Sequence, residues 1–131
     1  MHHVDNLVIS CIDFRFRPQI ARWMAEQLDD QADLVAIAGA SKAITDESSQ
    51  KIVLNQIRIA HDLHSITTVH ILDHMDCGAY GGSSQFSNRE DELAMHTEKL
   101  KEAGQIIATH FPGLRLELYV VDFDVISQIT H

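Results

Sequence analysis

Two short segments of the sequence carry the residues that could do chemistry. Cys11, Asp13 and Arg15 alternate in CIDFR, and His74 and Cys77 lie in HMDCG. Two thiolates and one imidazole are a suitable set of ligands for tetrahedral zinc. Three protein ligands leave one position open, as in catalytic zinc sites, where a bound water can ionise near neutral pH. Alternatively, the two cysteines are simply small buried side chains that bind no metal.

Asp13 and Arg15 follow Cys11 at the spacing of residues on one face of a strand. If strand geometry continues to residue 15, both side chains point toward the metal. The arginine would keep the carboxylate ionised, and the carboxylate could accept a hydrogen bond from zinc-bound water or hydroxide and orient it. A structural ion pair that closes the end of the strand is the other interpretation.

The hydrophobic pattern predicts that strands and helices alternate along the chain. Short apolar runs predict four strands, at Leu7–Ser10, Leu34–Ala38, Ile66–Leu72 and Leu114–Val121. Helical spacing predicts a helix that starts near Pro18, a second over about 46–64, and a third after a capping box formed by Ser87 and Glu90. The third helix has its apolar stripe at Leu93, Leu100, Ala103 and Ile107. The last strand has the alternation of an edge strand, and the final segment, DFDVISQITH, fits either a short helix or an extended tail.

This order of elements predicts a mostly parallel sheet with helices on both faces and right-handed crossovers. In open sheets with strand order 2-1-3-4, ligands bind beyond the carboxyl ends of strands one and three, where the chain changes direction across the sheet. Cys11 follows the first expected strand, and His74 and Cys77 follow the third. The topology therefore brings the three candidate ligands together.

The two segments, CIDFR and HMDCG, resemble the zinc motifs of the β-class carbonic anhydrases, and the resemblance extends from about Leu7 to Val121. It implies a four- or five-stranded sheet, zinc held by Cys11, His74 and Cys77, and a catalytic pair formed by Asp13 and Arg15. The activity implied is the reversible hydration of carbon dioxide to bicarbonate by a zinc-bound hydroxide. The partners implied are this small-molecule substrate and a second copy of the chain, in a homodimer or a larger oligomer built from dimers.

The sequence departs from the family pattern in three places. No helical arm precedes the first expected strand, and the segment after the second strand, 37–41, has Ile-Ala-Gly-Ala-Ser where the family often has an Arg-Asn-Ala-Gly-like stretch. Asp73 stands before the ligand histidine, where the family usually has glycine; its carboxylate could orient a ligand or perturb the site.

Three other interpretations of the zinc site remain. The same site could hydrolyse carbonyl sulfide or carbon disulfide. Asp13 could occupy the fourth zinc position, as in an inactive state of some members of the family. The third is a non-catalytic zinc that stabilises the fold or serves an interaction, and it predicts four protein ligands and unfolding on chelation.

Composition and charge narrow the classes of protein that fit. The 131 residues are 45% hydrophobic and 22% charged, with no linker-like segment, which predicts one α/β domain over 1–131. The formal net charge of -9 argues against nucleic-acid and anionic-membrane partners, which need a basic surface. The sequence shows neither the layout of a signal peptide nor a membrane-spanning apolar run, so we expect a cytoplasmic protein.

Overall fold

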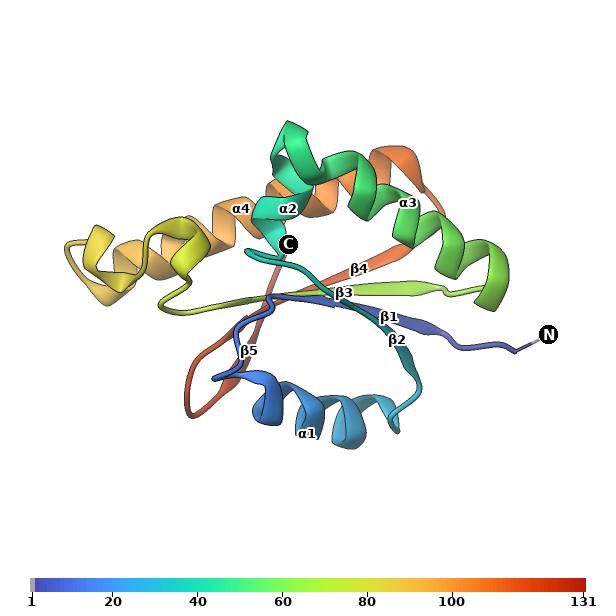
Figure 1. Cartoon of the computed structure of the whole chain (residues 1–131), viewed down its shortest axis with the longest axis horizontal. Helices are drawn as coiled ribbons and strands as arrows, with labels where there is room; N and C mark the ends of the chain where they lie inside the picture. Colours follow the sequence, from blue (N-terminus) through green and yellow to red (C-terminus); the bar gives the residue numbers. More distant parts are fainter. Residues whose placement is uncertain (1) are drawn as a thin grey trace.

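A twisted five-stranded sheet forms the centre of the structure, which is a computed structural model that describes residues 2–131 (Figure 1). The strands run in the order β2-β1-β3-β4-β5. Their bounds are β1 Asn6–Ser10, β2 Ala32–Ala36, β3 Thr68–His74, β4 Arg115–Val121 and β5 Ile126–Ile129. The first four are parallel, and β5 pairs with β4 in the antiparallel sense. The α/β class and the predicted order 2-1-3-4 are confirmed; Met1, included in the predicted domain 1–131, lies outside the described residues.

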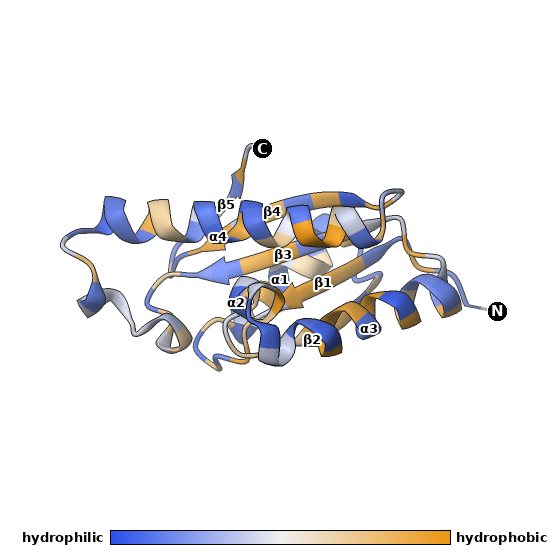
Figure 2. Ribbon diagram, turned by 90° about the horizontal axis from the view of Figure 1, so that it is seen from above, coloured by the Kyte–Doolittle hydropathy of each residue, from blue (hydrophilic) through white to orange (hydrophobic). Residues whose placement is uncertain are grey.

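Helices cover the two faces of the sheet unequally. Helix α1 (Arg17–Leu28) lies on one face, while α2 (Ser41–Thr45), α3 (Glu47–His64) and α4 (Arg89–His110) lie on the other (Figure 1). In Figure 2 the strands are largely hydrophobic, whereas the helices alternate between hydrophobic and hydrophilic segments. This pattern is expected where a sheet is covered on both faces by amphipathic helices.

The end of the sheet differs from the expectation that β4 is an edge strand. β4 pairs with β3 along seven residues and with β5 on its other side, and it is β5 that forms the edge. The alternation within β4 is real, because Leu118 and Val120 belong to the larger core and Tyr119 to the smaller core on the α1 face. The alternation therefore reflects the two different cores on the two faces of β4, not an exposed edge. The final segment contains the strand β5 and no helix.

The helices also differ in detail from the prediction. The segment before α3 forms the separate short helix α2, which directly follows a turn at Gly39 and Ala40. Helix α4 is capped by Asn88, whose side chain accepts a hydrogen bond from the Asp91 amide at 2.8 Å, so Ser87 is not the cap. None of the helices within residues 2–131 combines the length and apolarity needed to cross a membrane.

The apolar stripe of α4 is shifted by one residue at its amino-terminal end. Leu93, predicted to be in the core, is 40% exposed. Glu92 and, one turn later, His96 are buried instead. Two polar residues in buried positions need polar partners, and these partners lie in the segment that carries the candidate ligands.

Candidate metal centre

The carboxyl ends of β1 and β3 bring the predicted ligands together. The two strands are parallel neighbours, with Ser10 paired with Leu72. Cys11 directly follows β1, His74 is the last residue of β3, and Cys77 comes after a turn in the next segment. The two sulfurs and a ring nitrogen of His74 lie within 4.8 Å of one another, so the cluster can hold a metal ion.

The orientation of His74 suits a metal ligand. Its Nδ1 lies 2.8 Å from the carbonyl oxygen of Met75, and it therefore donates its proton there. Nε2 is buried and has no hydrogen-bond partner among residues 2–131. A backbone carbonyl on one nitrogen typically fixes the tautomer in which the other nitrogen offers its lone pair to a metal. With the sulfurs of Cys11 and Cys77, this gives a soft three-ligand set that fits zinc.

The metal-free site already favours one thiolate. A hydrogen bond from the adjacent Cys77 thiol is the main cause that lowers the pKa of Cys11 to about 3, and it outweighs burial, which acts in the opposite direction. The pKa of Cys77 is raised, because of its contact with Cys11 and its burial. Burial acts against protonation of His74, but the nearby Cys11 sulfur and the Met75 carbonyl raise its pKa. Metal binding to all three residues must therefore displace protons.

Asp13 and Arg15 meet beside the cluster, although β1 ends before them and strand geometry does not continue to residue 15. Arg15 donates to both carboxylate oxygens of Asp13, at distances from 2.7 to 3.1 Å. These hydrogen bonds lower the pKa of Asp13 to about 2. Oδ2 of Asp13 is 3.7 Å from Nε2 of His74, so the ionised carboxylate faces the ligand set.

Asp76 is a further partner of Arg15 that sequence reasoning missed. It lies between the two candidate ligands of HMDCG, and its carboxylate and carbonyl oxygens each accept from Arg15 at 2.9 Å. Its own amide donates to the buried carboxylate of Glu92 at 2.7 Å. Arg15 is thus held from both sides, and α4 holds the loop between His74 and Cys77. The position of Asp76 inside the motif was the one signal available in the sequence.

A small apolar cleft adjoins Cys11 and Asp13. Its volume is about 130 Å³, and its apolar lining comes from Ile12, Ile20, Met24 and Leu34. The buried ring of Phe16 packs against the His74 ring, with centroids 4.5 Å apart. The cluster therefore adjoins both an aromatic side chain and a cleft that suits a small apolar molecule.

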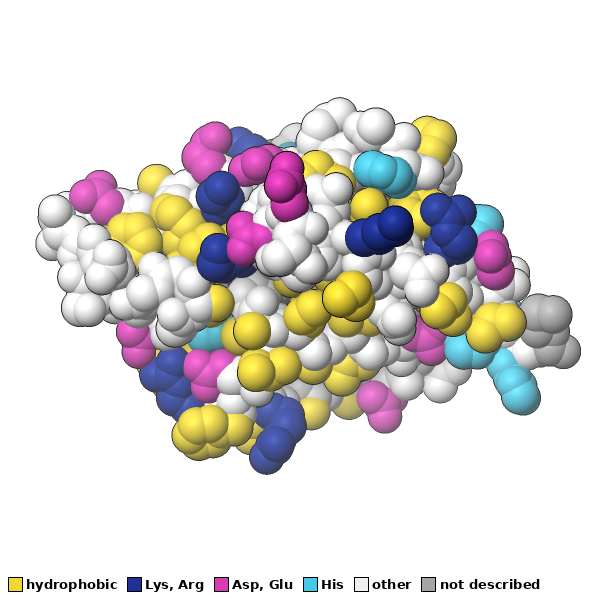
Figure 3. All heavy atoms as spheres, turned by 45° about the horizontal axis from the view of Figure 1, so that its top comes forward, with side chains coloured by type: hydrophobic (Ala, Val, Ile, Leu, Met, Phe, Trp, Pro, Cys, Tyr) yellow, Lys and Arg dark blue, Asp and Glu magenta, His cyan; other side chains and the backbone are white. Residues whose placement is uncertain are grey.

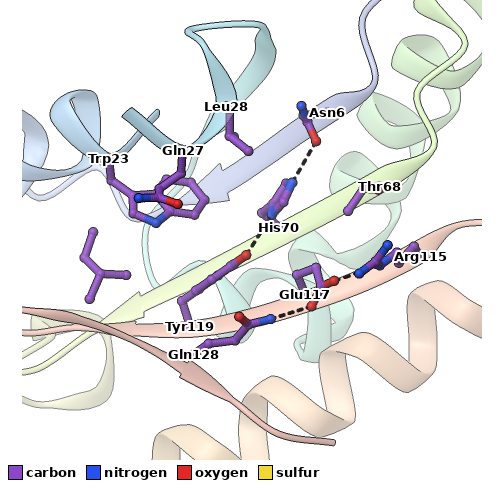
Figure 4. A pocket seen from close by; sticks show the side chains of 11 residues that line it. Asn6, Trp23, Gln27, Leu28, Thr68, His70, Arg115, Glu117, Tyr119 and Gln128 are labelled. Carbon is purple, nitrogen blue, oxygen red and sulfur yellow. Dashed lines mark hydrogen bonds and ion pairs between the residues drawn. The ribbon is translucent and has the colours of Figure 1, made fainter. Parts of the chain in front are cut away.

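A larger hollow, of about 630 Å³, lies on the α1 face and contains none of the candidate ligands (Figure 4). It lies near the amino ends of the strands, since Asn6, Thr68 and Arg115 line it. Its buried histidine, His70, is hydrogen-bonded to Tyr119 at 3.1 Å and to Asn6 at 2.9 Å (Figure 4). Glu117 in the same hollow accepts from Arg115 and from Gln128 (Figure 4).

Comparison with solved structures identifies the type of fold. One of two tetrameric β-carbonic anhydrases from Sordaria macrospora matches with a TM-score of 0.70 and 10% identity, covering 100% of this chain and 83% of the other. The β-carbonic anhydrase CafA of Aspergillus fumigatus matches with a TM-score of 0.63 and 17% identity, covering 98% and 76%. At such identities the likeness shows the fold alone, and that fold is of the β-carbonic-anhydrase type.

The sequence itself gives the family. The family model described as "Putative carbonic anhydrase" matches residues 1–130, and the chain belongs to this family. An uncharacterized protein of Rickettsia bellii (strain RML369-C) is 36% identical over 137 residues, which cover 98% of this chain and 84% of that protein.

Proposed function

We propose that this protein is a zinc-dependent carbonic anhydrase, which converts carbon dioxide and water into bicarbonate and a proton, and the reverse. The observation that carries the proposal is the cluster of Cys11, His74 and Cys77, with donor atoms within 4.8 Å of one another, beside the ion pair of Asp13 and Arg15. Membership of the carbonic anhydrase family supports it.

The three-ligand set would hold zinc through the sulfurs of Cys11 and Cys77 and Nε2 of His74. Zinc in a site with an open position lowers the pKa of a bound water toward neutrality and so supplies a nucleophile. Within residues 2–131 the cluster has three such donors, which favours a catalytic site over a structural site with four protein ligands.

The role proposed for Asp13 is to accept a hydrogen bond from the attacking oxygen and orient it. Its low pKa leaves it ionised at neutral pH, and Arg15 holds both of its oxygens. Because both oxygens of Asp13 already accept hydrogen bonds from Arg15, we assign the carboxylate an orienting role rather than direct ligation of the metal. Arg15 in turn keeps Asp13 charged and correctly placed.

The apolar cleft beside Cys11 is proposed as the entry for carbon dioxide. It is lined by the apolar side chains of Ile12, Ile20, Met24 and Leu34, which suit a small molecule without a dipole moment. Carbon disulfide is also linear and apolar, and carbonyl sulfide is linear and only weakly polar, so this lining suits them as well. A test of function should therefore include one of them.

A homo-oligomer is also proposed, with the dimer as its smallest unit. Two large apolar side chains next to the site, Ile12 and Phe14, are 64% and 71% exposed. Leu34, on the edge strand β2, lines the same cleft as Ile12 and is 54% exposed. Hydrophobic side chains gather across the middle of the face in Figure 3, and such patches are typical of interfaces. The tetrameric Sordaria relative is consistent with this arrangement.

The experiment that tests the proposed roles compares Asp13→Asn with Asp62→Asn, an exposed carboxylate on α3 that contacts His61. Hydration of carbon dioxide and hydrolysis of carbonyl sulfide are both measured on zinc-loaded protein. We expect carbon dioxide hydration to exceed carbonyl sulfide hydrolysis, and Asp13→Asn to lower its kcat by about 100-fold or more. Asp62→Asn should keep the full rate. An Asp13→Asn variant as fast as the control would remove Asp13 from the mechanism.

A further inference from the structure

Asp73 lies in a buried hydrogen-bond network next to the candidate metal site. Asp73 is 1% exposed, and its carboxylate accepts three hydrogen bonds. Oδ1 accepts from the Ser41 amide at 3.0 Å, and Oδ2 accepts from the Ser41 hydroxyl at 2.6 Å and from Nδ1 of His96 at 2.7 Å. The Tyr80 hydroxyl lies 2.6 Å from that of Ser41. Because the Ser41 hydroxyl donates its hydrogen bond to Asp73, Tyr80 is the donor in that last bond.

The turn held by this network is strained. Ala40, which directly precedes Ser41, has a φ of 46° and a ψ of -91°, a conformation rarely adopted by residues other than glycine. Gly39 before it has a φ of 85°. Strained backbone persists only where the surrounding contacts determine it. Here the two hydrogen bonds from Ser41 to Asp73 supply such contacts at one end of the turn.

The other end of the turn contacts a metal ligand. The Gly39 amide donates to the sulfur of Cys11 at 3.4 Å. An N–H donor at a thiolate stabilises its negative charge and fixes its direction. A continuous path thus runs from Asp73 through Ser41 and the strained turn to Cys11.

The network itself is a costly arrangement for stability alone. Asp73 and His96 are both 1% exposed or less, and Nε2 of His96 is buried without a hydrogen-bond partner in the part of the chain that the structure describes. Apolar residues of similar volume would avoid the cost of burying these polar groups. A role in geometry accounts better for the network than a contribution to stability does.

We propose that Asp73 is a positioning residue of the metal site, which fixes the Gly39–Ala40 turn through Ser41 and thereby the hydrogen bond that orients the Cys11 thiolate. His96 holds the same carboxylate from α4 and ties the turn to that helix. The inference rests on the proposed function in one respect, namely that Cys11, His74 and Cys77 bind a metal. It adds residues that touch neither the metal nor the substrate.

The test compares Ser41→Ala and Asp73→Asn with Tyr119→Phe. The control also removes a side-chain hydrogen bond next to the central strand β3, since Tyr119 contacts His70 at the distant end of that strand. Zinc affinity is measured by competition with a chelator, and the absorption spectrum of the cobalt-substituted protein reports the cobalt–thiolate bonds. Thermal unfolding of each variant shows that it is folded.

We expect Ser41→Ala and Asp73→Asn to weaken zinc binding about tenfold or more, as changes in residues that orient metal ligands usually do. Their cobalt–thiolate absorption should shift, while Tyr119→Phe keeps the affinity and spectrum of the unaltered protein. If both variants fold and bind zinc as the unaltered protein does, with the same cobalt spectrum, this inference fails and the proposed function stands. If the unaltered protein binds neither metal, both fail.

Discussion

The guanidinium of Arg15 lies between two carboxylates, those of Asp13 and Asp76. The hydrogen bonds from Arg15 are the main cause of the low pKa of Asp13. Since Arg15 also binds the loop between His74 and Cys77, it joins the segment after β1 to the segment after β3. A single side chain therefore sets the charge of Asp13 and its place relative to the ligands.

Replacing Arg15 should change the titration of Asp13. In the zinc-free protein Asp13 has a pKa of about 2 and stays ionised from pH 5 to pH 3. In Arg15→Gln its pKa should rise toward the ordinary value of about 3.9. Carboxyl carbon NMR shifts measured over this pH range check it, with Arg58→Gln, on the distant helix α3, as the control. An Asp13 signal that does not titrate in Arg15→Gln would contradict this account.

His70 makes stability depend on pH. Burial, with a smaller contribution from Arg115, lowers its pKa to about 4, although Glu117 acts in the opposite direction. The unfolded chain, in which histidine has a pKa of about 6.5, binds the proton more readily. The contribution of neutral His70 is therefore full above pH 6.5 and is lost as the pH falls toward 4.

For His70 the expected loss between pH 7 and pH 5 is about 2 kcal/mol in the free energy of unfolding. Urea unfolding at the two pH values, with a chelator present, measures it. The His70→Gln variant, in which the side chain no longer titrates, should show a smaller difference by that amount. Equal differences in the two proteins would show that His70 is not the group responsible.

At the scale of elements, we expect the turn between β2 and α2 to set the geometry of one candidate ligand, because the Gly39 amide donates to the sulfur of Cys11. Gly39 has a φ of 85°, and a Cβ placed there would lie 2.8 Å from Cβ of Lys42. Gly39→Ala should therefore lower the free energy of unfolding by about 1 kcal/mol or more. It should also weaken zinc binding, because the amide that donates to Cys11 must move. Denaturant unfolding and chelator competition measure the two effects.

Gly113 offers a matched control for Gly39. A Cβ at Gly113 meets no atom within 4 Å, and its φ is not in the left-handed region. Gly113→Ala should leave both stability and zinc affinity nearly unchanged. If Gly39→Ala behaves in the same way, the turn does not constrain Cys11.

The comparison of sequence and structure is most instructive in α4. The apolar residues at positions 93, 100, 103 and 107 predicted the helix, but spacing of three and four residues also fits 92, 96, 100, 103 and 107. The second series is the buried one, and it contains Glu92 and His96. A preference for apolar residues hid the polar contacts because hydrophobic patterns carry no information on which polar groups meet across the fold.

At the scale of the whole molecule, topology made it predictable that the candidate ligands lie close together. Parallel strands β1 and β3 lie side by side, so residues that follow them meet even though Cys11 and Cys77 are far apart in sequence. The position of β5 was not predictable in the same way, since a short strand at the edge has little hydrophobic signal of its own. The partners of Ser41 and Asp73 likewise depend on contacts between elements.

The exposed apolar residues give a prediction for the whole assembly. In solution the protein should be a homo-oligomer, with a mass that is a multiple of 14.7 kDa. Burial of Phe14 against a second copy would exclude water from its ring, whereas a charge there would oppose association. Size-exclusion chromatography with light scattering should show smaller species for Phe14→Asp than for the unaltered protein. A monomeric unaltered protein would contradict the proposed assembly.

The most direct test of the central proposal is stopped-flow hydration of carbon dioxide by zinc-loaded protein between about pH 6.5 and 9, where zinc-bound water ionises. The same measurement is made on Cys77→Ser, which lacks one candidate ligand. The account predicts a rate far above that of buffer, dependent on zinc and lost in the variant. A rate equal to that of buffer at every pH, from protein shown to contain its zinc, would contradict it.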